Sequence, residues 1–349
     1  MSATETSVYP WQEDAWRRLM QLRARLPHAI LLHGPAGSGK TLFAERFAQA
    51  LLCQAPAPDG HACGTCLSCG WFANYAHPDY RRVRPEALED EVAAEGEEGA
   101  DAETGKKGGK AARAPSRDIK VEQVRALSGF MSISTHRQGV RVVLLHPAEA
   151  LNTIAANALL KTLEEPPPAT VFLLVANGLD RLLPTILSRC RKFALPLPEA
   201  AQAVQWLAAQ GVEDAQVWLA REGGAPLAAL GHAREGGGEA FSILLEHLAR
   251  PREGDALKTA ELLQKHPLDE LSGWQQRWLY DMFSCKMAGR IRYYPGHGKA
   301  LEELAARADT AALLRAVKSA AQRRAVSGHP LAARLFIEDM LLDYATLFS

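Results

Sequence analysis

The segment from Gly34 to Thr41 has the residue types and spacing of a phosphate-binding loop. It reads G-P-A-G-S-G-K-T and fits the pattern G-x-x-x-x-G-K-[ST] at every fixed position. Its glycines let backbone N–H groups converge on phosphate oxygens at a helix N-terminus, Lys40 would reach the β- and γ-phosphates, and Thr41 would bind Mg²⁺. The candidate ligands of ATP or ADP are Gly34, Gly37, Ser38, Gly39, Lys40 and Thr41. The alternative is a glycine turn that serves only as scaffold.

Hydrolysis of a bound triphosphate needs acidic groups that the sequence does not place beside this loop. A carboxylate at the end of a neighbouring strand should hold Mg²⁺, and another group should orient the attacking water. The predicted strand 142–145 runs instead into His146 and Pro147, and the next acid is Glu149. A neutral histidine is a poor ligand for Mg²⁺, because this hard ion prefers oxygen. The sequence therefore predicts a phosphate loop without its hydrolytic partners.

Four cysteines in one short segment have the spacing of a metal site. Cys53, Cys63, Cys66 and Cys69 follow the pattern C-x9-C-x2-C-x2-C, and the C-x2-C step lets two sulfurs meet at one ion. Four thiolates fill a tetrahedral zinc site and leave no position for a substrate, so the predicted site is structural. His61 is the one substitute ligand nearby. The alternative is four reduced cysteines in a loop that binds no metal.

Arg189, in the run Ser188-Arg189-Cys190, is a third candidate. An arginine in such a place is most often part of a surface salt bridge, and composition alone favours nothing else. An arginine presented to the triphosphate of a neighbouring subunit can, however, stabilise the transferred charge and accelerate hydrolysis by about a thousandfold or more. Glu164 and Glu165 end a predicted helix before a run of prolines and are expected to be solvated.

Alternating strands and helices are expected to position these residues. Apolar runs predict buried strands at 29–32, 141–145 and 171–175, and helices are predicted over 14–26, 121–130 and 157–163. The phosphate loop falls between the first of these strands and a further helix. This order predicts an α/β domain with a mostly parallel sheet covered on both faces. Small helices are predicted over 199–229 and helices from about 239 to the C-terminus.

Composition excludes several classes of protein. The 349 residues are 47% hydrophobic and 23% charged, which is typical of a globular protein. Neither a membrane helix nor a secretory signal is evident, so a cytoplasmic protein without membrane contact is expected. With 40 basic and 40 acidic residues, the charge does not demand direct binding to duplex DNA. Residues 86–116 hold nine acids and no aromatic residue, which predicts a disordered loop.

Three features together resemble the clamp-loader subunits of the bacterial replicative polymerase, a branch of the AAA+ ATPases. They are the phosphate loop with the four-cysteine module after it, the run N-A-L-L-K-T-L-E-E-P-P over 157–167, and Ser188-Arg189-Cys190. The resemblance covers residues 9–197 and extends more weakly through 330–344. It implies an AAA+ P-loop domain over 1–197 with a zinc module at 53–69 and the insertion 86–116, a helical lid domain over 198–238, and a helical collar domain over 239–349.

Two departures from the ATPase subunits of that family, gamma and tau, point to its delta-prime branch. Gamma and tau end the relevant strand with Asp-Glu where this chain has His146 and Pro147, and they carry a lid arginine where Leu227 stands. The run Tyr9-Pro10-Trp11 supports the same assignment. The resemblance therefore implies an accessory subunit of DNA polymerase III that is no enzyme on its own.

The resemblance also implies partners and a mechanism. Together with gamma or tau and delta subunits, the chain would form a hetero-pentamer that loads the sliding clamp onto primer–template DNA. It would act as a stator, and Arg189 would be the arginine finger that completes the ATP site of an adjacent gamma or tau subunit. Many delta-prime subunits have a degraded phosphate loop, whereas this loop is intact, so binding of ATP or ADP without hydrolysis stays open.

Two other functions stay open at this point. One is a catalytically active, gamma/tau-like ATPase in which Glu149 or a displaced carboxylate holds Mg²⁺, and such an enzyme would depend strongly on that ion. The other is a zinc-bearing, nucleic-acid-binding protein with a vestigial ATPase fold. The weak net charge counts against the second of these.

Overall fold

The computed structural model describes residues 6–89, 115–136, 139–235, 238–251, 253–329 and 331–348. The chain divides into two compact units, residues 1–197 and residues 198–349. Most of the predicted disordered insertion, residues 90–114, lies outside the described residues. Its described ends are joined, because the Ala87 N–H donates to the carbonyl oxygen of Ser116 at 3.1 Å. The three predicted domains stay a prediction.

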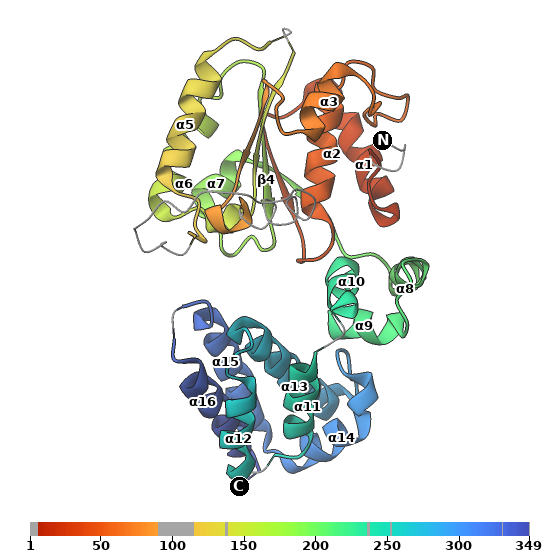
Figure 1. Cartoon of the computed structure of the whole chain (residues 1–349), viewed down its shortest axis with the longest axis vertical. Helices are drawn as coiled ribbons and strands as arrows, with labels where there is room; N and C mark the ends of the chain where they lie inside the picture. The colour runs from red at the N-terminus through yellow and green to blue at the C-terminus, as the bar shows by residue number, and fades with distance from the viewer. Residues whose placement is uncertain are drawn as a thin grey trace, which may run out of the picture. The chain divides into compact units, whose positions relative to one another are not determined.

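A parallel sheet of five strands forms the centre of the first unit (Figure 1). The strands are β1 (Ala29–His33), β2 (Tyr80–Val83), β3 (Arg141–Leu145), β4 (Thr170–Ala176) and β5 (Arg191–Ala194). Their order is β2-β3-β4-β1-β5, and every neighbouring pair is parallel. The three strands predicted from apolar runs are the three central ones. β2 and β5 carry no such run, because they are edge strands and part of each faces solvent.

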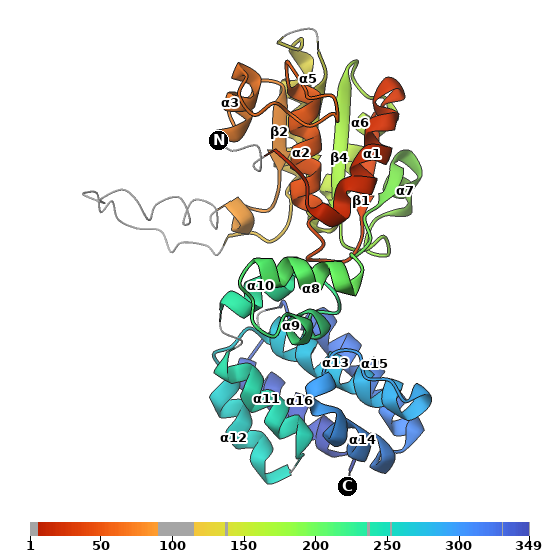
Figure 2. The same cartoon turned by 90° about the vertical axis from the view of Figure 1, so that its right-hand side faces the viewer.

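Helices cover both faces of the sheet, as predicted (Figure 2). One face packs against α1 (Glu13–Gln21), α2 (Lys40–Leu52) and α3 (Leu67–Ala73). The other packs against α5 (Val121–Ser132), α6 (Thr153–Glu164) and α7 (Pro184–Arg189). Side chains alternate along each strand, so Leu144 of β3 meets Phe43 and Phe47 of α2, whereas Leu145 contacts the opposite layer.

Two predicted helices have different bounds in the structure. The helix predicted over 14–26 ends at Gln21 and continues as the 3₁₀ turn η3 (Leu22–Arg25). The helix predicted over 157–163 begins earlier, at Thr153. Asn152 caps it, since its side-chain oxygen accepts the N–H of Ala155 at 2.8 Å.

The second unit is helical, as predicted. Its first three helices, α8 (Ala200–Ala209), α9 (Ala215–Arg221) and α10 (Pro226–Arg234), share a small core. A larger core lies among α11 (Glu239–Ala249), α12 (Glu253–Leu263), α13 (Leu268–Ala288), η5 (Pro295–His297), α14 (Gly298–Arg307), α15 (Thr310–Val326) and α16 (Ala333–Ala345). Trp278 of α13 is fully buried there and donates to the hydroxyl oxygen of Tyr344 at 2.9 Å.

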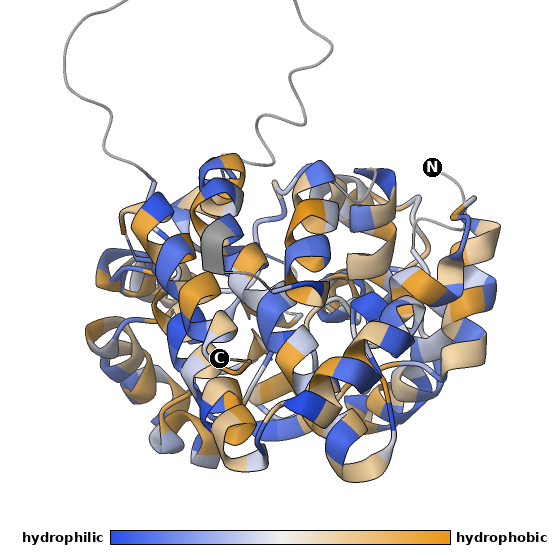
Figure 3. Cartoon of the chain, turned by 90° about the horizontal axis from the view of Figure 1, so that it is seen from below, coloured by the Kyte–Doolittle hydropathy of each residue, from blue (hydrophilic) through white to orange (hydrophobic). Residues whose placement is uncertain are grey.

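The helices of this unit are amphipathic, and hydrophobic and hydrophilic residues alternate along their ribbons (Figure 3). Within the described ranges, no helix combines the length and the apolar character that crossing a bilayer requires.

Candidate nucleotide and metal sites

The phosphate loop connects the carboxyl end of β1 to the N-terminus of α2. Two of its glycines have left-handed backbone conformations, with φ of +72° at Gly37 and +88° at Gly39. Gly39 is the N-cap residue of α2, which begins at Lys40. Because a left-handed φ disfavours any side chain, the spacing of these glycines follows from the path of the backbone around the loop.

Lys40 folds over the loop. Only 5% of the residue is exposed, and its Nζ donates to the carbonyl oxygen of Pro35 at 2.6 Å. Burial lowers the pKa of Lys40 to about 8, against the opposing effect of the Glu149 carboxylate. Ser38 is fully buried, and its hydroxyl oxygen has no hydrogen-bond partner among the described residues. These groups line the position that the sequence motif assigns to phosphate.

The N-terminal segment holds this loop from outside. In η2 (Pro10–Gln12) and its flank, the Trp11 Nε1 and the Gln12 Nε2 both donate to the carbonyl oxygen of Ser38, at 3.1 and 2.9 Å. The Tyr9 ring stacks on Trp11 with 4.8 Å between centroids. It lies so close to Gly39 that a Cβ there would be 2.6 Å from a ring carbon. The sequence carries no signal for these contacts, because they join segments 26 and more residues apart.

The carboxyl end of β3, where Mg²⁺ ligands would be expected, is followed by a histidine and a proline instead of a carboxylate. His146 donates its backbone N–H to the carbonyl oxygen of Val83 at 3.1 Å. Burial, together with the charges of Arg82 and Arg84, lowers the pKa of His146 to about 4. The imidazole is therefore neutral at pH 7 and offers no oxygen to a metal.

Glu149 is the nearest acid along the chain, and it is tied to the loop after β4. Its Oε1 accepts the backbone N–H groups of Asn177 and of Gly178, the latter at 3.0 Å. Its Oε2 is buried and has no hydrogen-bond partner within the described part of the chain. The carboxylate also acts on the pKa of Lys40, so its charge is felt at the phosphate loop. The spacing of the sequence gives no indication of the link to Asn177.

Arg189 lies at the C-terminus of α7 and is held there by two contacts. Its Nη1 donates to the carbonyl oxygen of Thr185 at 2.9 Å, and its Nη2 pairs with the carboxylate of Glu164. About a third of the Arg189 side chain is exposed, whereas the next residue, Cys190, is buried. Glu164 and Glu165 are exposed, as expected, and the position of Glu164 at the end of α6 also brings its carboxylate against Arg189.

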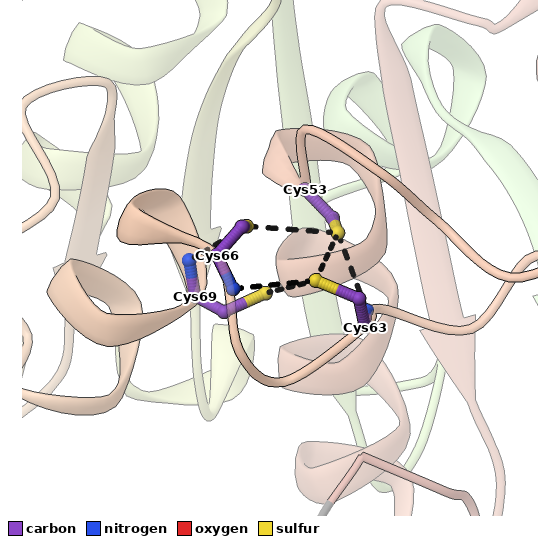
Figure 4. A group of neighbouring side chains, drawn as sticks. All are labelled: Cys53, Cys63, Cys66 and Cys69. Carbon is purple, nitrogen blue, oxygen red and sulfur yellow. Dashed lines mark hydrogen bonds between the residues drawn. The ribbon is translucent and has the colours of Figure 1, made fainter.

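The four predicted cysteines come together at the end of α2 and the start of α3 (Figure 4). Their sulfurs all lie within 4.8 Å of one another, with 3.5 Å between Cys53 and Cys63, 3.9 Å between Cys53 and Cys66, and 4.0 Å between Cys63 and Cys69. A tetrahedron with metal–sulfur bonds of about 2.3 Å has sulfurs about 3.8 Å apart. The set therefore fits a tetrahedral metal ion such as zinc.

The surroundings of two of these thiols shift their pKa values in opposite directions. Backbone N–H groups of Thr65 and Cys66 lower the pKa of Cys63 to about 6, whereas burial raises the pKa of Cys69. His61 is not among the clustered ligands. Its ring stacks on Trp16, with 4.3 Å between parallel rings.

The fold and the sites define a class of protein: a P-loop α/β domain with a parallel five-stranded sheet and a four-cysteine module, followed by a helical unit. A family model described as "DNA polymerase III, delta subunit" matches residues 11–199. The "DNA polymerase III subunit delta'" of Pseudomonas aeruginosa is 39% identical over 83% of this chain and 79% of its own length. The chain belongs to this family of DNA polymerase III delta' subunits.

Other matches agree with this assignment. The delta' subunit of Haemophilus influenzae is 29% identical over 90% of this chain and 89% of its own length. Among solved structures, a gamma subunit-related protein of Thermotoga maritima aligns with 97% of this chain and 100% of that chain at 13% identity. The TM-score of this alignment is 0.39.

The contact between Tyr9 and Gly39 generates a prediction on stability. Gly39→Ala is expected to lower the free energy of unfolding by about 1–3 kcal/mol, because the residue keeps a left-handed φ and its Cβ would displace the Tyr9 ring. Urea denaturation of the full chain measures this. Gly129→Ala is the matched control, since it lies within α5 with open space around its Cβ and should be neutral or slightly stabilising. Equal stability of both variants would contradict the prediction.

Proposed function

We propose that this chain is a non-hydrolysing subunit of the DNA polymerase III clamp loader, an accessory protein rather than an enzyme on its own. Its partners would be gamma or tau and delta subunits in a hetero-pentamer that loads the sliding clamp onto primer–template DNA. Residues 198–238 would form its lid and residues 239–349 its share of the collar. One observation supports the non-hydrolysing assignment most directly. The phosphate loop is intact, but β3 is followed at once by His146 and Pro147 rather than by acidic residues.

The electrostatics around His146 support this proposal. A working site would concentrate carboxylates where Mg²⁺ bridges the phosphates. Here a neutral imidazole lies near Arg82 and Arg84, and none of these three side chains offers an oxygen ligand to Mg²⁺. A nucleotide would be held by the loop N–H groups, the N-terminus of α2 and Lys40, with little contribution from Mg²⁺.

One observation favours the alternative of an active, gamma/tau-like ATPase. The Oε2 of Glu149 is buried without a hydrogen-bond partner among the described residues, and its charge acts on Lys40. A carboxylate in that position could hold Mg²⁺. Against this, the other oxygen already accepts two backbone N–H groups beyond β4, which fixes the carboxylate to the protein.

Nucleotide binding by the isolated chain separates these two functions. We expect ATP or ADP to bind with an affinity that changes by less than about threefold when Mg²⁺ is chelated, and we expect no turnover. Lys40→Ala should abolish the binding. Isothermal titration calorimetry with and without chelator, together with a phosphate-release assay, measures both quantities.

Glu149→Gln is the control for this experiment, because an amide oxygen can still accept the Asn177 and Gly178 N–H groups. The proposal predicts that this variant binds nucleotide much as the parent chain does. Strong Mg²⁺ dependence, together with turnover that both Lys40→Ala and Glu149→Gln abolish, would instead establish the ATPase.

We propose further that Arg189 acts in trans as an arginine finger. Its guanidinium lies at the end of a helix and is partly exposed, and it is already paired with a carboxylate oxygen. In the assembled complex it would exchange Glu164 for the γ-phosphate oxygens at a neighbour's ATP site. Such an exchange would replace one carboxylate oxygen by phosphate oxygens, which can accept bidentate hydrogen bonds from a guanidinium, and would stabilise the charge of the transferred phosphoryl group.

Replacement of Arg189 tests this role. Arg189→Ala should leave folding and pentamer assembly nearly intact and lower the DNA-stimulated ATPase rate of the reconstituted complex by about tenfold or more at the site it serves. Arg189→Lys should fail to restore the rate, because lysine lacks the planar fork of donors. Arg191→Ala, an exposed arginine two residues away, is the matched control. An unchanged ATPase rate in an assembled Arg189→Ala complex would contradict the proposed role of Arg189 as an arginine finger.

We propose that the four-cysteine module binds one structural zinc ion, on the strength of the sulfur separations. Metal analysis of the purified chain should give about one zinc per chain. Cys66→Ser should release the ion and loosen the segment between α2 and α3, whereas Cys285→Ser, a cysteine outside the cluster, should keep it. Protein that is fully folded but metal-free after purification without chelators would contradict this proposal.

A further inference from the structure

The helical unit contains a pocket that has no part in the nucleotide or zinc sites. It has a volume of about 400 Å³ and lies among α9, the first turn of α11 and the segment around η5. Its aromatic walls come from Trp218, Phe241, Tyr293 and Tyr294. The polar side chains of Arg221, Glu239, Ser242 and His297 also line it. A largely apolar cavity of this size with a few convergent polar groups is typical of a small-molecule site.

Arg221 is an unusual residue to find in such a wall. Only 4% of it is exposed, and its Nε is buried without a hydrogen-bond partner among the residues that the structure describes. Its ring contact is close, with the guanidinium carbon 3.4 Å from the centroid of Phe241. Its one ion pair, from Nε to Glu222, spans 3.5 Å. Buried polar atoms ordinarily have hydrogen-bond partners, which makes the guanidinium of Arg221 a candidate donor to a ligand in the pocket.

The carboxylate of Glu222 lies closer to two other cationic side chains than to Arg221. It accepts a contact from His232 Nδ1 at 2.9 Å and pairs with Arg277 Nη1 at 3.1 Å, both shorter than its contact with Arg221. Two arginines and a histidine thus surround one buried carboxylate. The excess of positive charge favours an anion in the neighbouring pocket.

The N-terminus of α11 faces the same space. This helix has eleven residues, and its N-cap is Gly238, which has no side chain to accept the N–H groups of the first turn. Such groups, together with the helix dipole, bind anions. Glu239 also lines the pocket, and its negative charge disfavours ligands that carry several charges.

The pocket wall is held in place before any ligand arrives. Asp281 is fully buried and accepts the backbone N–H groups of Arg292, Tyr293 and Tyr294 at 2.8–3.2 Å. The Tyr294 hydroxyl donates to the carbonyl oxygen of Trp274 at 3.2 Å. A preformed wall of this kind lowers the entropy that a ligand must lose in ordering its site.

We propose that this pocket binds a small organic anion, one carboxylate or phosphate group carried on a flat apolar ring. The charged group would accept hydrogen bonds from Arg221 and from the first turn of α11, and the ring would pack among Trp218, Phe241 and Tyr293. Such a ligand would join α9 to α11. The site is independent of the proposed clamp-loader role.

Binding of three matched probes to the full chain tests the proposal. Phenylacetate and phenyl phosphate carry the two possible anionic groups, and phenylacetamide is the neutral control. Saturation-transfer NMR and calorimetry should show saturable binding of at least one anion, about tenfold or more tighter than the amide, the equivalent of one charge-assisted hydrogen bond. The stronger of the two anions identifies the group. Equal binding of the acid and the amide, or no saturation by either anion below about 20 mM, would overturn the proposal.

Three variants locate the site. Arg221→Gln should remove the preference for the anion over the amide. Ser242→Glu adds a second acidic side chain at an exposed residue of the pocket rim. It should weaken binding of the anion by about tenfold without unfolding the chain. This variant therefore tests the site even if Arg221→Gln does not fold. Arg290→Gln removes an exposed positive charge outside the pocket and should bind as the parent chain does. Full anion binding by Ser242→Glu would place the anion elsewhere and contradict the assignment.

Discussion

A bound triphosphate is broken only where a metal ion can bridge its phosphates, and a metal ion is held only where oxygen ligands surround it. At the end of β3 this chain offers a buried neutral imidazole and a proline, with two arginines close enough to act on the imidazole. The loop that would bind phosphate is nevertheless complete, from its left-handed glycines to the buried Lys40. In the role we propose, binding and hydrolysis of the nucleotide are therefore separated by this one short stretch of sequence.

The parallel sheet brings the phosphate loop and the residues that follow β3 and β4 close together. Its parallel order places the carboxyl ends of β1, β3 and β4 at the same edge, so the phosphate loop, His146 and the Asn177–Gly178 segment that binds Glu149 are neighbours. The segment Tyr9–Gln12 holds the loop from the opposite side through the Ser38 carbonyl oxygen. Arg189 belongs to a different layer, at the end of α7 on the other face of the sheet.

Sequence alone predicts the parts of this arrangement that are local. The phosphate loop, the four cysteines and the three central strands follow from spacing and apolar runs, because each is contained within a few residues of chain. β2 and β5 do not, since edge strands such as Arg191–Ala194 carry charged side chains. Contacts across long separations are also hidden: Glu149 with Gly178, Gln12 with Ser38, and the approach of Arg221 to Phe241 depend on the tertiary fold.

The central claim is that this subunit holds ATP without breaking it. The most direct measurement is single-turnover hydrolysis in a reconstituted complex whose gamma or tau subunits carry an alanine at their own phosphate-loop lysine, so that Lys40 of this chain is the one intact loop lysine. The account predicts that radiolabelled ATP stays bound and intact in that complex on primed DNA. Release of labelled phosphate that disappears with Lys40→Ala would contradict it.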